Sequence, residues 1–297
     1  MAGRITKLLN RQTPERPDVT EAVAQLTRLA ETRPDLRHPA LLQSVLIRAL
    51  YAVSAVVSAC SLTAEEATRK LTGGVPLLRN ISLPCAAPHL CATFLRLCMA
   101  ASTVTDIDRQ PYKTLAAAVN KQRLDLWMLG NALLAGAADT LSAQLTAHSH
   151  PPDLVVTLLR LALLPFLEQV ATQLMTWRDG QPWGRGYCPT CGAWPVFAEQ
   201  RGLEQRRYLR CGLCASSWEI DRLLCPFCAT RDHALLGYLQ LEGEEQQQRV
   251  ATCDACQSYI KLRSTLTPLT TPQLLLEEVA LLHLDLIVMA KGYVSPL

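Results

Sequence analysis

Apolar residues recur at spacings of three and four from Asp18 to about Trp177, which is the period of an amphipathic helix. Alternation of apolar and polar residues, the sign of a strand, is scarce in the same stretch. The pattern therefore predicts an all-α domain of helices packed on helices over residues 1–180.

The clearest helix start in this half is Asp18, which follows Pro17. Glu21 lies three residues later and can return a hydrogen bond to the cap, and an apolar stripe begins at Val23. We expect a helix that Asp18 caps.

A leucine-rich stripe runs through residues 113–147, with Gly130 and Gly136 as potential breaks. This segment is predicted to be one or two helices. Before it, Pro76, Pro84 and Pro88 exclude a continuous helix over residues 73–88. We expect an ordered loop there, and we consider it a candidate groove for a partner.

The last helical pattern begins near Thr271, a capping residue followed by Pro272. Its apolar face is expected to contain five residues and to end at Gly292: Leu275, Val279, Leu282, Leu286 and Met289. We predict a C-terminal helix, within residues 266–297, that docks on the core.

Two stretches raise the question of membrane insertion, residues 40–60 and 154–167. Polar residues such as Arg48 and Arg160 interrupt them, so neither is predicted to span a membrane. The first twenty residues are basic and lack the apolar run of a secretory signal. We therefore expect a cytoplasmic protein, whose thiols stay reduced.

The composition changes to glycine and proline at residues 179–186, where we place a domain boundary. Four Cys-x-x-Cys pairs of identical spacing follow it: Cys188 and Cys191, Cys211 and Cys214, Cys225 and Cys228, and Cys253 and Cys256. Two such turns can present four thiolates to one tetrahedral metal ion at about 2.3 Å. Incidental cysteines are improbable at this spacing, and no βαβ unit supports a thioredoxin-like role.

The stretches between the pairs predict two hairpins, with strands at residues 194–199 and 207–210, and at residues 235–241 and 249–252. We expect two rubredoxin-like or zinc-ribbon modules, over residues 181–224 and 225–265. Sequential grouping of the pairs is favoured, with the first two pairs at one site and the last two at the other. A cross-braced grouping, first pair with third, uses the same ligands and stays open.

Tetrahedral sulfur ligation suits both zinc and iron, and four protein ligands leave no position for water or substrate. The sequence has no phosphate-binding glycine loop, nucleophile elbow or H-E-x-x-H helix. We predict no catalytic residues and no cofactor beyond the two metal ions. The chain is expected to be an assembly or accessory protein and not an enzyme.

Other candidate groups are given structural roles. We expect four remaining cysteines to be small core residues: Cys60, Cys85, Cys91 and Cys98. His148 and His150 are expected in a solvated loop, and His283 and Asp285 point to different helix faces, which argues against an acid–base pair.

The formal charge of +3 is too small for a dedicated nucleic-acid binder, and bound thiolates would lower it further. Four arginines are expected to balance the negative charge of the metal sites: Arg207, Arg210, Arg222 and Arg249. No nucleic-acid partner is expected. A zinc-ribbon nucleic-acid-binding protein and a rubredoxin-like electron carrier remain the alternative functions.

The cysteine half resembles the formate dehydrogenase accessory protein family FdhE over about residues 187–293. The resemblance rests on the four pairs with their flanking residues, namely Gly192, Pro195, the run Arg207-Tyr208-Leu209-Arg210, Trp218, Arg222, Tyr259, Lys261, Leu284-Asp285 and Gly292-Tyr293. It implies a cytoplasmic factor that is required for active respiratory formate dehydrogenase and that binds the catalytic subunit without joining the mature enzyme. It also implies iron in rubredoxin-like sites.

Overall fold

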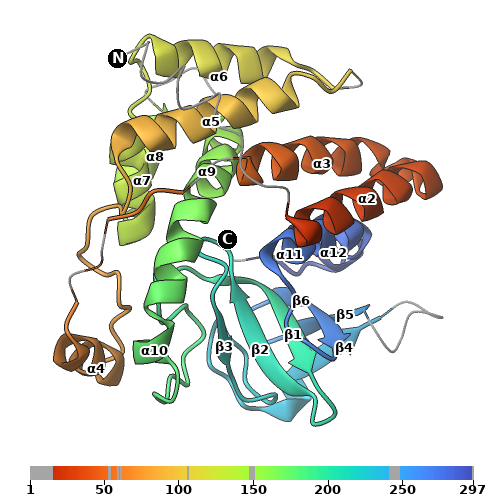
Figure 1. Cartoon of the computed structure of the whole chain (residues 1–297). Coiled ribbons are helices and arrows are strands. Elements are labelled where there is room, and N and C mark those ends of the chain that lie inside the picture. The colour runs from red at the N-terminus through yellow and green to blue at the C-terminus, as the bar shows by residue number, and fades with distance from the viewer. Residues whose placement is uncertain are drawn as a thin grey trace. The chain divides into compact units, whose positions relative to one another are not determined.

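The computed structural model describes residues 16–52, 55–58, 60, 62–105, 107–146, 151–240 and 248–295. The chain divides into two compact units (Figure 1). The first consists of Met1–Ser61 and Leu78–Gln173, and the second of Leu62–Leu77 and Leu174–Leu297.

The first unit is helical, as the apolar period predicts. Its helices in chain order are α2 (Pro17–Thr32), the short 3-10 helix Pro34–Leu36, α3 (Arg37–Tyr51), α5 (Ala87–Ala101), α6 (Gln110–Asn120), α7 (Leu126–Ala135), α8 (Ala138–Thr146) and α9 (Pro152–Gln173). Helix α3 packs on α2 and α5, and α5 also packs on α6 and α9. The core of this unit therefore lies between α3, α5 and α9.

Helix α2 begins two residues earlier than expected. Arg16 is its N-cap residue and Pro17 occupies the first turn, so Asp18 lies inside the helix. The predicted cap by Asp18 is wrong, because proline at the first helical position sets the start. The Asp18 carboxylate instead pairs with the Arg16 guanidinium at 2.6 Å and also faces the positive end of the helix dipole.

The described part of residues 110–146 contains three helices, α6 to α8, where one or two were expected. Gly136 ends α7 in the left-handed conformation, with φ of 69°. Gly130 is not a break. It lies inside α7, where a Cβ atom would come within 2.7 Å of a terminal methyl group of Leu83, so a larger residue would require the Leu83 side chain to shift. His148 and His150 fall outside the described residues.

Helix α9 is long and apolar enough to cross a membrane by length and composition alone. However, 61% of its most apolar window is buried within the protein. It is a core helix of the first unit, which agrees with the prediction that residues 154–167 do not span a membrane.

The second unit includes an early segment of the chain. Helix α4 (Ala64–Thr72) packs on α10 (Met175–Arg178), and the backbone N–H of Leu77 donates to the Pro189 carbonyl at 2.9 Å. The Tyr187 hydroxyl donates to the Gly74 carbonyl at 2.7 Å. Residues 62–77 therefore support the first cysteine pair. No pattern in the sequence predicts this contact.

The rest of this unit is built on a mixed sheet. Its described strands are β1 (Pro195–Arg201), β2 (Arg206–Cys211), β3 (Ser217–Glu219), β4 (Leu236–Leu239), β5 (Gln248–Cys253) and β6 (Ser258–Thr265). They form the order β3-β2-β1-β6-β5-β4, with β1 and β6 parallel and the other neighbours antiparallel.

The expected hairpins are β1–β2 and β4–β5, and the unpredicted strand β6 joins them into a single sheet. Residues 258–262 of β6 are all buried, including Lys261. The strand was not predicted, although apolar and polar residues alternate from Ile260 to Arg263.

Two C-terminal helices, α11 (Thr271–Ala280) and α12 (Leu282–Ala290), pack on this sheet, where a single helix was predicted (Figure 1). Thr270, and not Thr271, caps α11 in a capping box with Gln273. The chain leaves helical geometry at Leu281, which changes the helical phase. The apolar residues of α12 that were expected to pack inward therefore face outward: Leu286 is 70% exposed and Met289 is 56% exposed. Their places in the core are taken by Leu284 and Val288.

A buried ion-pair network fastens α11 to the sheet. The Glu199 carboxylate on β1 is fully buried and accepts from Arg210 at 2.7 Å and from Arg201 at 2.9 Å. Glu199 also accepts from the Leu269 backbone N–H at 3.1 Å, and Arg210 donates to the Leu269 carbonyl at 2.6 Å. One carboxylate thus orients two strands and the segment that leads into α11.

We predict that Glu199→Ala lowers the free energy of unfolding of the second unit by about 3 to 5 kcal/mol, because it leaves the Arg210 charge buried without its partner. Glu204→Ala is the control. It removes an exposed carboxylate paired with Arg206 and should change the stability by less than about 1 kcal/mol. Denaturant unfolding followed by tryptophan fluorescence measures both, and equal effects would show that the Glu199 network adds nothing.

Candidate metal centres

The four cysteine pairs adopt the same local turn. In three of them, the N–H of the first cysteine donates at 2.9 Å to the carbonyl five residues later, at Ala193, Ser216 and Thr230. The fourth makes the equivalent pairing of Cys253 with Ser258 in the β5–β6 ladder. We call these turns knuckles one to four, at residues 188–191, 211–214, 225–228 and 253–256.

The residue after each knuckle has a positive φ angle: Gly192 at 85°, Ala215 at 56°, Ala229 at 60° and Gln257 at 53°. Only Gly192 is of the type that favours this left-handed conformation. The other three residues adopt it at an energetic cost, which shows that the surrounding structure imposes the turn. Only Gly192 could have indicated this geometry in the sequence.

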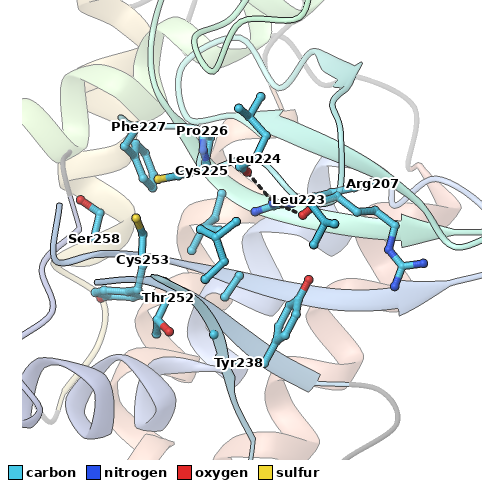
Figure 2. A pocket seen from close by; sticks show the side chains of 16 residues that line it. Arg207, Leu223, Leu224, Cys225, Pro226, Phe227, Tyr238, Thr252, Cys253 and Ser258 are labelled. Carbon is cyan, nitrogen blue, oxygen red and sulfur yellow. Dashed lines mark hydrogen bonds between the residues drawn. The ribbon is translucent and has the colours of Figure 1, made fainter. Parts of the chain in front are cut away.

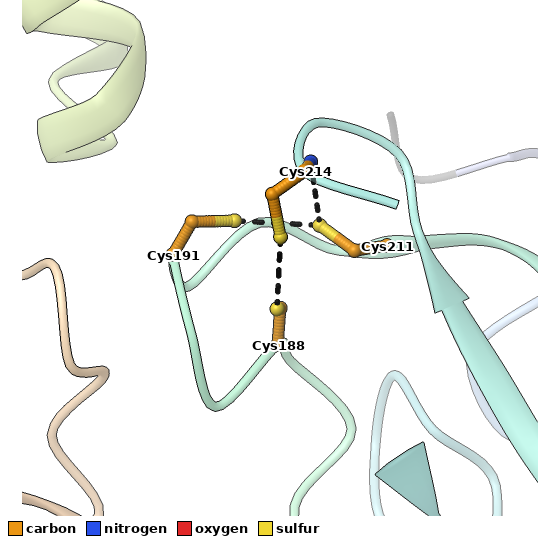
Figure 3. A group of neighbouring side chains, drawn as sticks. All are labelled: Cys188, Cys191, Cys211 and Cys214. Atoms are coloured by element: carbon orange, nitrogen blue, oxygen red, sulfur yellow. Dashed lines mark hydrogen bonds between the residues drawn. The ribbon is translucent and has the colours of Figure 1, made fainter. Parts of the chain in front are cut away.

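Knuckles one and two bring four thiols together in the first site. The Cys191 and Cys211 sulfurs lie 3.3 Å apart, and those of Cys188 and Cys214 lie 3.6 Å apart. Figure 3 shows the four sulfurs turned toward one another. All four residues are buried, with at most 2% exposure. The first site is closed to solvent on every side.

Knuckles three and four form the second site. The sulfurs of Cys225 and Cys256, and those of Cys228 and Cys253, are each 3.7 Å apart. Cys225 and Cys253 are buried, but Cys256 is only half-buried and Cys228 is exposed. Figure 2 shows Cys225 and Cys253 on neighbouring walls of a pocket lined by Arg207, Phe227 and Tyr238 among others. The second site therefore has one open side, at Cys228.

In the described part of the chain, the eight knuckle cysteines form two groups, and within each group all sulfurs lie within 4.8 Å of one another. The grouping is sequential, so the cross-braced alternative does not apply. Both groups are able to hold a metal ion, and their donor set of four sulfurs fits zinc and iron. The first site also directs the backbone N–H groups of Leu213 and Cys214 at the Cys211 sulfur, at 3.3 and 3.4 Å, as a thiolate requires.

The burial of these thiols has a chemical consequence. Without an ion, burial raises the pKa of the Cys211 thiol and of the Cys225 thiol well above their ordinary values. A metal ion therefore has to displace protons from both sites when it binds.

The other cysteines stand apart from the two sites. Cys85 and Cys98 are buried in the first unit, and burial raises the pKa of each thiol to about 12. They are unreactive core residues, as predicted. Cys60 and Cys91 are half-buried.

The arginines expected to neutralise the metal sites have more specific contacts. Arg207 is buried, and its Nη1 donates to the carbonyl oxygen of Leu224 at 3.0 Å, directly before knuckle three. Arg210 belongs to the Glu199 network. These two cations are inside the protein and do not contribute to a basic surface, which weakens the case for a nucleic-acid-binding ribbon.

Comparison with known proteins agrees with this geometry. The family model of the FdhE central domain matches residues 187–222, which contain the whole first site. The chain is 35% identical over 169 residues to an FdhE homologue of Stutzerimonas stutzeri, covering 54% of this chain and 50% of that protein. It is 39% identical over 80 residues to FdhE of Escherichia coli O127:H6, covering 26% of this chain and 25% of that protein.

Over about half of its length the chain is similar to FdhE proteins. Its fold is similar to the crystal structure of the FdhE protein from Pseudomonas aeruginosa, with a TM-score of 0.60 and 24% identity over 96% of this chain and 95% of that one. The chain spans about half the length, or less, of the curated FdhE relatives that it matches.

The difference in exposure between the two sites predicts an order of reactivity. With both sites loaded with zinc, a thiol alkylating reagent should modify Cys228 first, and the four cysteines of the first site last, because the reagent cannot reach buried sulfurs. Peptide mass spectrometry after timed alkylation measures this order, with the buried Cys98 as an internal unreactive control. Equal rates at Cys188 and Cys228 would contradict the assignment of a closed and an open site.

Proposed function

We propose that this chain is a cytoplasmic accessory protein for the formation of active respiratory formate dehydrogenase, and that it binds the catalytic subunit of that enzyme. The observation that carries the proposal is the coincidence of the FdhE central-domain match with the first four-cysteine site. The similarity to FdhE proteins supports a role in formate dehydrogenase formation. The buried position of α9 supports a protein that works free of the membrane.

We also propose that the eight knuckle cysteines are the ligands of two tetrahedral metal ions. Iron is favoured by the family resemblance, and zinc is compatible with the same donors. Bound ions would supply crosslinks between knuckles that belong to different parts of the sheet. Four sulfur ligands leave no position for a substrate, which supports an accessory role and not catalysis.

The test is co-purification with a formate dehydrogenase catalytic subunit from cells that express both proteins. We expect wild type and Cys91→Ala to capture the subunit, since Cys91 belongs to neither site. Cys188→Ala and Cys253→Ala should reduce capture at least about tenfold, because loss of a ligand weakens metal binding and the fold that depends on it. Capture that is absent for wild type would refute the proposed partner. Undiminished capture by both site variants would separate partner binding from the metal sites.

A rubredoxin-like electron carrier is the second candidate, and the exposure of Cys228 favours it because electrons exchange more readily at a surface ligand. This function requires iron that changes oxidation state. Metal analysis and visible spectra of protein purified without oxygen should then show iron, with a charge-transfer spectrum that bleaches on reduction. Zinc alone in both sites would exclude the electron carrier and leave the accessory function intact.

A further inference from the structure

The segment that leads into the first metal site is in backbone contact with the second site. Gly186, two residues before knuckle one, lies against Pro226 inside knuckle three, and a Cβ atom built on Gly186 would overlap the Pro226 carbonyl oxygen. Pro226 is buried. Only glycine permits so close an approach. The chain segment that precedes knuckle one is therefore in direct contact with knuckle three of the second site.

Two side-chain contacts accompany the backbone contact. The ring of Trp194, three residues after knuckle one, lies 5.8 Å from the ring of Phe227 in knuckle three, measured between centroids. Tyr187 meets the same Trp194 ring edge-on at 6.1 Å. Aromatic side chains on both sides of knuckle one thus pack in a row that ends on knuckle three.

A third contact comes from the first hairpin. Arg207 on β2 reaches across to the Leu224 carbonyl and, at 3.4 Å, to the Arg222 carbonyl. Both carbonyls belong to the segment that leads into knuckle three, and Figure 2 shows the Leu224 end of this segment beside Arg207. The position of Cys225 therefore depends on β2, whose last residue is Cys211, a cysteine of the first site.

From these contacts we propose that the two sites bind their metal ions cooperatively, through the contact of residues 186–194 and Arg207 with knuckle three. An ion in the first site holds knuckle one against knuckle two and so fixes Gly186 and Trp194. This completes the surface on which Pro226 and Phe227 pack, with Cys225 and Cys228 in position for the second ion. Because coupling between two binding sites is reciprocal, an ion in the second site strengthens binding at the first by the same factor.

This inference rests on the proposed metal sites, and zinc is the probe that tests both. The full chain is titrated with Zn²⁺ against a competing chelator, and alkylation mapped by mass spectrometry assigns each bound ion to its site. Wild type should bind two ions. Disabling the first site with Cys188→Ser and Cys191→Ser should weaken zinc binding at the second by about 5- to 150-fold. Disabling the second site with Cys225→Ser and Cys228→Ser should weaken zinc binding at the first site by the same factor. General misfolding would not make the two factors equal.

A matched pair of glycine variants tests the contact with all eight cysteines present. Gly186→Ala places a methyl group against the Pro226 carbonyl and should weaken zinc binding at the second site at least about fivefold. Gly184→Ala, whose methyl group meets nothing within 4 Å, should bind as wild type does.

Two outcomes separate the proposals. Fewer than two bound ions in wild type would refute the metal sites and the coupling together. The coupling alone would be refuted if wild type binds two ions and the zinc affinity of the second site is unchanged by disabling the first site. The same affinity in Gly186→Ala and Gly184→Ala would be part of that result.

Discussion

The convergence of four sulfurs at each of two points is the constraint on which the second unit depends. Each site joins the two ends of a hairpin, because one knuckle precedes its first strand and the other follows its second. The turns have to place both sulfurs of a knuckle on one side, and three non-glycine residues adopt left-handed backbone angles to allow it. A metal ion that holds four thiolates offsets such local costs, since structural four-ligand sites contribute on the order of 10 kcal/mol to folding.

The sheet extends this constraint beyond the hairpins. Parallel pairing of β1 with β6 places Phe197 opposite Lys261 and joins the hairpins edge to edge. The Glu199 network and the Lys261–Asp285 ion pair, at 2.7 Å, then attach α11 and α12 to the central strands. Charged side chains in the middle of a sheet are stable only because each has a partner. The helices at the C-terminus are therefore held by charge pairing as well as by their apolar faces.

The sequence predicted those features that depend on short-range patterns. Spacing within the cysteine pairs was enough to select the eight candidate cysteines, although their sequential grouping came from the structure, and helical periodicity was enough to predict a helical first unit. The place of β6 between the two hairpins was missed, although Ile260 to Arg263 alternate between apolar and polar, and so was the break at Leu281, which turned Leu286 outward. Both depend on long-range packing: β6 is buried by its neighbours in the sheet, and α12 takes its phase from the sheet below it. Residues 62–77 joined the second unit for the same reason, through contacts with residues more than a hundred positions away.

Charge was the feature most easily misread. In the sequence, Arg207 and Arg210 suggest a strand with a basic face. In the structure, Arg207 hydrogen-bonds the segment before knuckle three, and Arg210 pairs with the buried Glu199 carboxylate. Their interior positions remove these two cations from the exposed surface. The two metal sites have different environments, because the first is enclosed by knuckle turns and contacted by residues 62–77, whereas the second opens at Cys228. A closed site suits a permanent structural ion, and an open site next to it suits contact with a partner. An accessory protein needs both properties, since it has to keep its own fold while it meets another protein.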